Sequence, residues 1–511
     1  MNELEHSTGT THPDVRISAT NFGPIESGIV DLRPLTVFVG PSNTGKTYFA
    51  ILIYALHRIM NGFSGPPGFD MLRYRFRKDL RTDKSANSHA EVLEEEFQDV
   101  LRKLDSEERS FRFSDLPKSM RDVIQAAFDD PKLLGAALET ELMRCFDLES
   151  VSDLVRFSGH PDSIKVSLDI SEEDRTLWRF HLGISESGVT TNGRIEDTVL
   201  LPEGWSATKS RFSPQLNRLI KEIRGIGLPL SLHIFEELLI AAGAAGRSET
   251  HYLPAARSGI MQSHRVIASS LVARSTRAGL EHFPELPTFS GVMADFMQQL
   301  ILYRENRGSD AHIRNLADAF ESEALAGQIR TSRPPAGGCP EFVYRPRESE
   351  ENIRLARASS MVSELAPVVL FLRGAVGRGD LLIIEEPEAH LHPAAQTRMA
   401  VTLARMVRAG VRVLVTTHSD WLLKEIGNLM REGELGRSEP TNGETLPSSL
   451  RPSEVGIWLF RKDGTSAGSI VEEIPFDRSE GVEPPDYEDV AEELYNRSAN
   501  LQNQLEEREH E

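Results

Sequence analysis

The sequence predicts an α/β fold in which a β-rich lobe leads into a core of parallel strands and helices, interrupted by a mainly helical insertion. Two observations carry this prediction. A short apolar strand, a glycine-rich loop and an amphipathic helix follow one another at residues 35–59. Much later, a fully apolar strand at residues 381–384 ends in two carboxylates. Residues 61–249, between them, are predicted to be an insertion that mixes helical and strand-like patterns and is not a long coiled coil.

The predicted elements follow from hydrophobic period and turn residues. Strands are predicted at residues 15–20, 28–32, 35–39, 163–170, 176–184, 341–344, 381–384, 411–415, 455–460 and 469–474. Helical patterns occupy residues 49–59, 89–146, 213–245, 257–327, 353–372 and 487–507. Turns or exposed loops are predicted at residues 22–24, 334–338 and 431–453.

Length and composition limit the classes of function. A chain of 511 residues is long enough for about two to four structural units, with 39% hydrophobic residues to form cores. We expect four segments: residues 1–60 and 250–430 as the two parts of one core domain, 61–249 as the insertion, and 431–511 as C-terminal strands and an acidic helix. The formal net charge of -20 disfavours general binding to nucleic acid or anionic membranes.

Cysteine content and hydropathy indicate the cellular compartment in which this protein is expected to act. Cys145 and Cys339 are distant from each other and lack a second Cys or His at metal-ligand spacing, so neither a disulfide framework nor a zinc site is predicted. The polar, acidic N-terminus does not resemble a signal peptide, and apolar runs fall short of the about 20 residues that cross a bilayer. We expect a cytoplasmic protein without a membrane span.

The glycine-rich loop fits the phosphate-loop pattern G-x-x-x-x-G-K-[ST]. It consists of Gly40, Pro41, Ser42, Asn43, Thr44, Gly45, Lys46 and Thr47. Its backbone N–H groups and the following helix N-terminus are suited to surround the β-phosphate of ATP. Lys46 would reach the β- and γ-phosphates, and the Thr47 hydroxyl would ligate Mg2+. A plain glycine turn is the alternative, which the flanking strand and helix disfavour.

Two acids follow the apolar strand at residues 381–384, at the edge where parallel sheets bind ligands. Glu385 would hold magnesium directly or through water, and Glu386 would act as general base toward the attacking water. His418 ends another apolar strand, where an imidazole is placed to sense or stabilise the γ-phosphate. For His390 and His392, a metal site is disfavoured because a third ligand is not evident nearby.

Together these motifs resemble the heads of ABC-type ATPases. The segments that carry the resemblance are residues 40–47, the EEPEAHLHP of residues 385–393 and the Thr-His-Ser of residues 417–419. The pattern is similar to the AAA-type ATPases of the overcoming-lysogenization-defect group, which are related to SMC and RecF-like heads. It covers residues 13–60 and 250–425. In this resemblance, Glu385 stands at the magnesium position, where an Asp is the commoner acid.

The resemblance implies that two heads enclose two ATP molecules, so a homodimer or higher even oligomer is expected. Each phosphate loop would face a signature segment of the other head, which here resembles residues 357–365 and not the LSGGQ of transporters. The segment lies near the start of a predicted helix, and its residues Ser359 and Ser360 would meet a γ-phosphate across the interface. Arg257 follows a strand that resembles one leading an arginine toward the site, although an exposed ion pair is the commoner role of such an Arg.

Relatives in this group often carry a TOPRIM nuclease, but the acidic motifs it needs are not found after residue 420. The resemblance therefore implies a separate effector protein, in anti-phage defence or DNA maintenance. Two alternatives stay open. The chain is a nucleotide-gated scaffold that holds an effector with incidental turnover, or it is a RecF-like repair ATPase that binds DNA.

A local DNA contact would come from residues 72–78, where cationic and apolar residues alternate. The alternative is an amphipathic edge element with solvated arginines, which the net charge of -20 favours.

Overall fold

The computed structural model describes residues 14–60, 111–118, 120–122, 125, 135–155, 163–172, 175–185, 188–196, 199–201, 249–275, 289–305, 310–332, 339–436, 447–462 and 468–509. The predicted helix at residues 213–245, the turn at 334–338 and the basic segment at 72–78 lie outside these residues. In the part of the chain described, no helix is long and apolar enough to cross a membrane.

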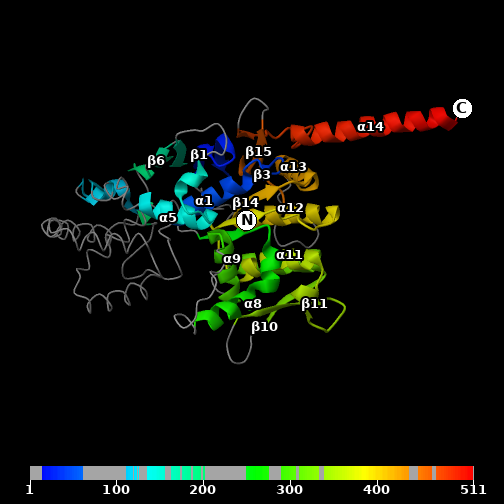
Figure 1. The fold of residues 1–511 in the computed structure, drawn as a ribbon, viewed down its shortest axis with the longest axis horizontal. Coiled ribbons are helices and arrows are strands. Elements are labelled where there is room, and N and C mark those ends of the chain that lie inside the picture. The colour runs from blue at the N-terminus through cyan, green and yellow to red at the C-terminus, as the bar shows by residue number, and fades with distance from the viewer. Residues whose placement is uncertain are drawn as a thin grey trace, which may run out of the picture. The chain divides into compact units, whose positions relative to one another are not determined.

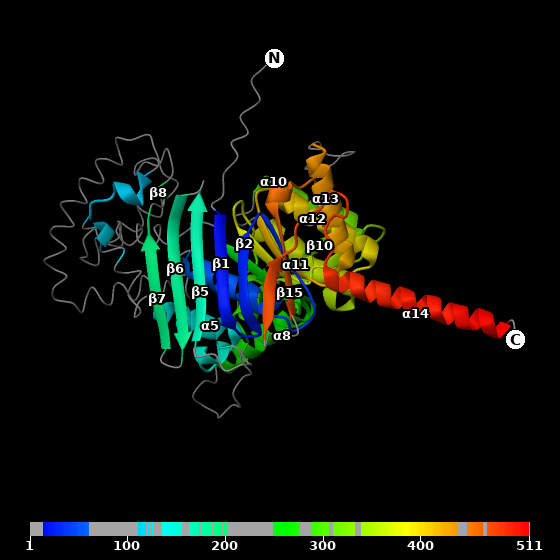
Figure 2. The ribbon, with the colours of Figure 1, turned by 90° about the horizontal axis from the view of Figure 1, so that it is seen from above.

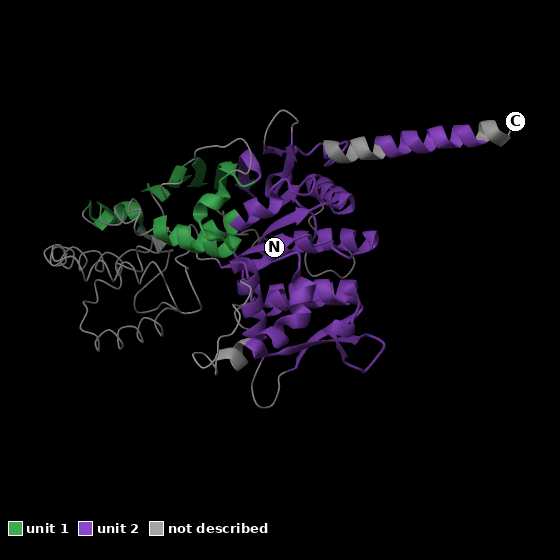
Figure 3. Cartoon of the chain, in the orientation of Figure 1, with its two compact units in different colours: residues 1–23, 52–248 green, residues 24–51, 249–511 purple. Residues whose placement is uncertain are grey.

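The chain divides into two compact units (Figure 3). The first contains residues 1–23 and 52–248, and the second contains residues 24–51 and 249–511. Helix α1 (Lys46–Met60) runs from the second unit into the first.

The described part of the first unit is built on an antiparallel sheet in the order β7-β6-β5-β1 (Figure 2). Its strands alternate buried and exposed residues, as expected for a sheet that covers a core with one face. The elements of this unit are β1 (Asp14–Phe22), β4 (Phe111–Arg112), α5 (Ala136–Phe146), β5 (Ser163–Glu172), β6 (Arg175–Ser185), β7 (Gly188–Ile195) and β8 (Val199–Leu201).

The second unit contains strands in the order β2-β16-β15-β3-β14-β13-β9, together with a three-stranded sheet β10-β11-β12. Its strands are β2 (Ile25–Leu32), β3 (Leu35–Val39), β9 (Thr250–Leu253), β10 (Gly327–Ser332), β11 (Glu341–Pro346), β12 (Ile353–Arg354), β13 (Leu381–Glu385), β14 (Arg412–Thr417), β15 (Val455–Lys462) and β16 (Ser469–Glu473). Its helices are α8 (Arg257–Ser275), α9 (Gly291–Ile301), α10 (Ala311–Phe320), α11 (Ser360–Gly374), α12 (Pro393–Arg408), α13 (Asp420–Glu434) and α14 (Pro485–Glu509).

Strands β3, β14, β13 and β9 are parallel neighbours, and every residue of each is buried. Burial on both faces explains why β3 and β13 are nearly continuous apolar runs and do not alternate. One face, with Val37 and Ile384, shares a core with α11, α12 and α13. On the other face, the ring of Phe38 contacts those of Phe49 and Phe460 at centroid distances of 5.7 and 4.9 Å.

The prediction of an α/β fold is confirmed, and most predicted strands are observed within one or two residues. Two predicted boundaries are wrong. The helix predicted from residue 353 begins at Ser360, because β12 and a short 3-10 turn precede it. The exposed loop predicted at residues 431–453 is shorter, since α13 continues to Glu434 and Leu450 is fully buried, with its N–H bonded to the Leu429 carbonyl.

Candidate functional site

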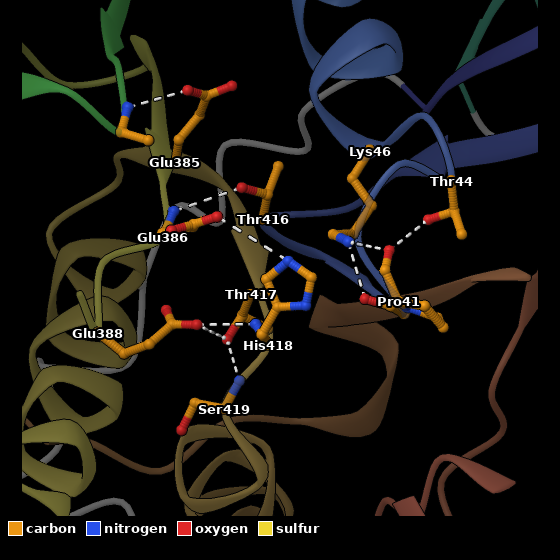
Figure 4. Close-up of polar contacts among 12 residues, drawn as sticks. Pro41, Thr44, Lys46, Glu385, Glu386, Glu388, Thr416, Thr417, His418 and Ser419 are labelled. Carbon is orange, nitrogen blue, oxygen red and sulfur yellow. Dashed lines mark hydrogen bonds and ion pairs between the residues drawn. The ribbon is translucent and has the colours of Figure 1, made fainter. Parts of the chain in front are cut away.

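The parallel strands bring the predicted site residues to one edge of the sheet. Because β3, β13 and β14 run in the same direction, their carboxyl ends lie side by side. The phosphate loop follows β3, Glu385 ends β13, and His418 follows β14. Figure 4 shows the side chains of Lys46, Glu386 and His418 around this edge. All of them belong to the second unit.

The glycines of the loop are required by its backbone. Gly40 and Gly45 have φ angles of 133° and 102°, which side-chain-bearing residues rarely adopt. A Cβ on Gly40 would lie 2.2 Å from the Phe460 carbonyl oxygen, and one on Gly45 would lie 2.6 Å from Ile25 Cγ1. The loop is therefore packed tightly against β15 and β2, which fixes the position of the α1 N-terminus that follows it.

Lys46 is buried and folded back on the loop. Its Nζ donates hydrogen bonds to the carbonyls of Gly40 and Pro41, both at 2.7 Å, and the Thr44 hydroxyl also donates to Pro41. Burial lowers the pKa of Lys46 to about 8, although the nearby carboxylates of Glu386 and Glu388 oppose this change. The loop thus holds a cation beside the N-terminus of α1, an arrangement suited to a polyphosphate.

Glu385 is buried, and its carboxylate lies on the β9 side of β13 in Figure 4, away from Lys46. Tyr252 donates its hydroxyl to Oε1 at 2.7 Å, and the Ala255 N–H donates to Oε2 at 2.9 Å. Both oxygens already accept hydrogen bonds, so the structure does not bring this carboxylate to the loop. Sequence reasoning could not find these partners, because Tyr252 in β9 and Ala255 just after it lie 133 and 130 residues earlier in the chain.

Glu386 differs from its neighbour in conformation and exposure. Its φ of 43° is in the left-handed region, and its N–H donates to the Thr416 carbonyl at 2.9 Å. This conformation turns its side chain, 45% exposed, toward β14, where Oε1 is 3.9 Å from His418 Nε2. The two adjacent acids therefore differ in their surroundings. Glu385 is hydrogen-bonded to Tyr252 of β9, whereas the carboxylate of Glu386 is exposed to solvent near His418.

His418 faces both Glu386 and Lys46. Burial lowers the pKa of its imidazole, and the charge of Lys46 lowers it further, while Glu386 opposes them. The side chain is consequently neutral at pH 7, which leaves one ring N–H as a donor and one nitrogen as an acceptor.

Glu388 is a site residue that sequence reasoning missed. Its Oε1 accepts hydrogen bonds from the Thr417 hydroxyl at 2.6 Å and from the His418 N–H at 2.7 Å. The other oxygen, Oε2, is buried and has no hydrogen-bond partner among the described residues. Burial raises the pKa of Glu388. A third acid two residues after Glu386, across a proline, was the available signal in the sequence.

We expect Glu388→Ala to lower the free energy of unfolding by about 2–4 kcal/mol, because it leaves two buried donors without an acceptor. Glu388→Gln retains an acceptor oxygen and removes only a charge that burial disfavours, so it is expected to cost less than half as much. Urea denaturation followed by circular dichroism measures both. Equal losses in the two variants would contradict the assigned role of Oε1.

The signature segment forms the start of α11. Ser359 is the N-cap, and its hydroxyl accepts from the Val362 N–H at 3.4 Å. Ser359 and Ser360 are both exposed, so the helix N-terminus is accessible to a ligand or to another molecule. Whether they contact nucleotide stays a prediction.

The remaining candidates have clear positions. Arg257 is fully buried, so the exposed ion pair considered for it is wrong. His392 caps α12 by accepting from the Ala394 N–H at 3.3 Å. His390 Nε2 lies 3.9 Å from Glu364 Oε1, on a side chain that is 62% exposed.

The region from α9 to the start of α13 contains most of the candidate site residues described above. Residues 287–423 match the AAA ATPase domain family. The matched AAA region includes the signature segment, Glu385, Glu386 and His418, and the phosphate loop lies before it.

No curated protein matches the chain. Similar solved structures include an Smc head bound to the C-terminal winged-helix domain of ScpA, with 11% identity and a TM-score of 0.41, covering 91% of this chain and 98% of that chain. An Smc head with an extended coiled coil and ScpA domain from Pyrococcus furiosus has 12% identity and a TM-score of 0.39, covering 91% and 96%. The SMC head domain from Thermotoga maritima has 10% identity and a TM-score of 0.35, covering 90% and 98%.

Proposed function

We propose that this chain binds ATP with magnesium at residues 40–47 and hydrolyses it. The observation that carries the proposal is the arrangement at one sheet edge of a loop-bound lysine, a half-exposed carboxylate and a neutral imidazole, namely Lys46, Glu386 and His418. The AAA ATPase match over residues 287–423 supports it.

Each side chain has a task in this reaction. When ATP binds, Lys46 Nζ would donate to phosphate oxygens in place of the carbonyls of Gly40 and Pro41. The N–H groups at the start of α1 would donate to the same phosphates. Glu386 would accept a proton from the attacking water. His418, held by Glu388 through its backbone N–H, would donate its ring N–H to the γ-phosphate.

Magnesium would neutralise charge that develops on the phosphates. The oxygen donors present suit this hard cation, because the exposed hydroxyl of Thr47 adjoins Lys46 and carboxylates lie across the edge. Glu385 would take part through a water molecule, since both of its oxygens accept hydrogen bonds from β9 and the segment after it.

We further propose that two copies engage around nucleotide, and that their engagement controls a separate effector in anti-phage defence or DNA maintenance. Support comes from the exposed N-terminus of α11, where Ser359 and Ser360 can meet a phosphate bound to another copy.

Ser360→Arg is expected to abolish this engagement, because a long cation would fill the space that the second copy needs. Phosphate release should fall about tenfold or more, with ATP affinity little changed. The measurements are phosphate release and solution mass with ATP-magnesium. Ser270→Arg, at an exposed position of α8, is the matched control and should behave like the unchanged protein. Unaltered mass and turnover in Ser360→Arg would contradict engagement through α11.

The experiment that tests the function is direct. Titration with a fluorescent ATP analogue and release of inorganic phosphate are measured on the unchanged protein with magnesium. Binding together with turnover supports the proposal. Binding without turnover excludes the ATPase, and absence of binding excludes the nucleotide site itself.

A further inference from the structure

Arg257, the first residue of α8, is completely buried beside the candidate site. Its Nη1 donates a hydrogen bond to the Glu385 carbonyl at 2.6 Å, and its Nη2 donates to the Glu386 carbonyl at 2.9 Å. Its Nε donates to the Glu364 carbonyl at 3.1 Å. The planar guanidinium therefore spans two segments, the turn after β13 and the first turns of α11.

Burying a guanidinium is costly unless it is paired. The partner here is Glu364, whose Oε2 is 3.1 Å from Arg257 Nε and whose side chain is 2% exposed. Burial lowers the pKa of Arg257, and carboxylates at residues 364, 385, 386 and 388 oppose this change. A guanidinium among four acids stays protonated, so its hydrogen bonds persist over the working pH range.

The turn that Arg257 contacts has an unusual backbone. Glu386 and His390 have φ angles of 43° and 60°, and left-handed conformations persist in such residues only when surrounding contacts hold them. On one side, the Glu386 N–H donates to Thr416. On the other, the Glu386 carbonyl accepts from both Arg257 Nη2 and the Ala389 N–H at 3.0 Å. Arg257 thus fixes the peptide from which the Glu386 side chain projects.

The other end of the contact lies on the signature helix. Glu364 follows the N-cap Ser359 by five residues, and both its side chain and its carbonyl face Arg257. Glu364 Oε1 also lies 3.9 Å from His390 Nε2, so α11 meets the turn at a second point. Movement at the exposed end of α11 would therefore be transmitted to the turn through the hydrogen bonds of Arg257 and its ion pair with Glu364.

We propose that Arg257 is a positioning residue that couples the N-terminus of α11 to the Glu386 turn. Engagement of a second copy at Ser359 and Ser360 thereby sets the carboxylate of Glu386 for hydrolysis. This inference rests on the proposed function for its consequence, while the coupling itself is a property of the chain alone.

The test compares Arg257→Lys with Arg373→Lys. A lysine at position 257 keeps the charge but cannot bridge two carbonyls and Glu364 together. Arg373 is the matched control, because it is likewise an arginine paired with a buried carboxylate, that of Glu321, but it lies on α11 at the end of the helix away from Ser359, where it also contacts Asp318.

Amide hydrogen exchange is measured without nucleotide. In Arg257→Lys, we expect exchange about tenfold faster at Ala389 and Leu391 in the turn and at Ser363 in α11, with the strands unchanged. In Arg373→Lys these amides should exchange as in the unchanged protein. Uniform acceleration throughout the chain, or acceleration confined to one of the two segments, would overturn the coupling.

Turnover is measured in parallel. Arg257→Lys should lower kcat about tenfold while the Kd for a fluorescent ATP analogue changes less than about threefold, because only the Glu386 turn shifts. Arg373→Lys should change neither. If the unchanged protein releases no phosphate but the exchange pattern is found, the proposed function fails and the coupling stands. If turnover is present but falls equally in both variants, the coupling is overturned.

Discussion

Glu386→Gln is expected to lower phosphate release by about 100-fold or more and to leave ATP binding intact. Glutamine is nearly isosteric but cannot accept a proton, so the loss equals the contribution of a general base. The side chain is 45% exposed, with its carboxylate 3.9 Å from His418, so little of the fold depends on it. Phosphate release and binding of a fluorescent ATP analogue are the measurements.

The same variant should accumulate the engaged, ATP-bound pair, so its solution mass should rise when ATP-magnesium is added. Glu385→Gln is the informative comparison, because its NH2 group would face one of the two groups that now donate to the carboxylate, the Tyr252 hydroxyl or the Ala255 N–H. That variant should lose about 1–3 kcal/mol of stability. If Glu386→Gln retained full turnover, Glu386 would not be the base.

The fold of the second unit was largely predictable because its central strands are buried on both faces. Residues 381–384 are apolar without interruption and residues 35–39 are apolar except for Thr36, a pattern that few other environments require. Predicted boundaries failed where tertiary contacts override local pattern. The helical pattern before Ser360 is interrupted by β12, which pairs with β11, and Leu450 is buried through a contact with α13.

The site was predictable where its residues belong to a recognisable motif or directly follow a strand. Lys46 belongs to the phosphate-loop pattern, Glu386 and His418 follow β13 and β14, and the structure brings the three together. The different surroundings of Glu385 and Glu386 result from the hydrogen bond of Tyr252 to Glu385 and from the left-handed φ of Glu386. Neither feature can be predicted from the spacing of residues in the sequence.

Arg257 shows the same limit more strongly. An arginine that follows a strand is compatible with an exposed ion pair. The guanidinium of Arg257 is instead buried and donates hydrogen bonds to the carbonyls of Glu385 and Glu386, which lie 128 and 129 residues later in the chain. Only the parallel pairing of β9 with β13 places them in contact.

Lys46→Ala is expected to weaken ATP binding by roughly 100-fold, or about 3 kcal/mol, since it removes a buried cation from the phosphate loop. Lys424→Ala is the control, because Lys424 is exposed and pairs with Asp420 one turn away. Isothermal titration measures both variants. Affinity within about threefold of the unchanged protein in Lys46→Ala would contradict phosphate binding at this loop.

The pH dependence of binding gives a sharper test of the same lysine. Because burial places the pKa of Lys46 at about 8 without nucleotide, the amine is protonated below that pH and neutral above it. Affinity for ATP should therefore fall as pH rises through about 8, and binding near this pH should take up a proton as the phosphates restore the charge. Titrations in buffers of different ionisation enthalpy measure that uptake. Lys46→Ala should lose it and Lys424→Ala should keep it, so equal proton uptake in both variants would assign the titration to another group.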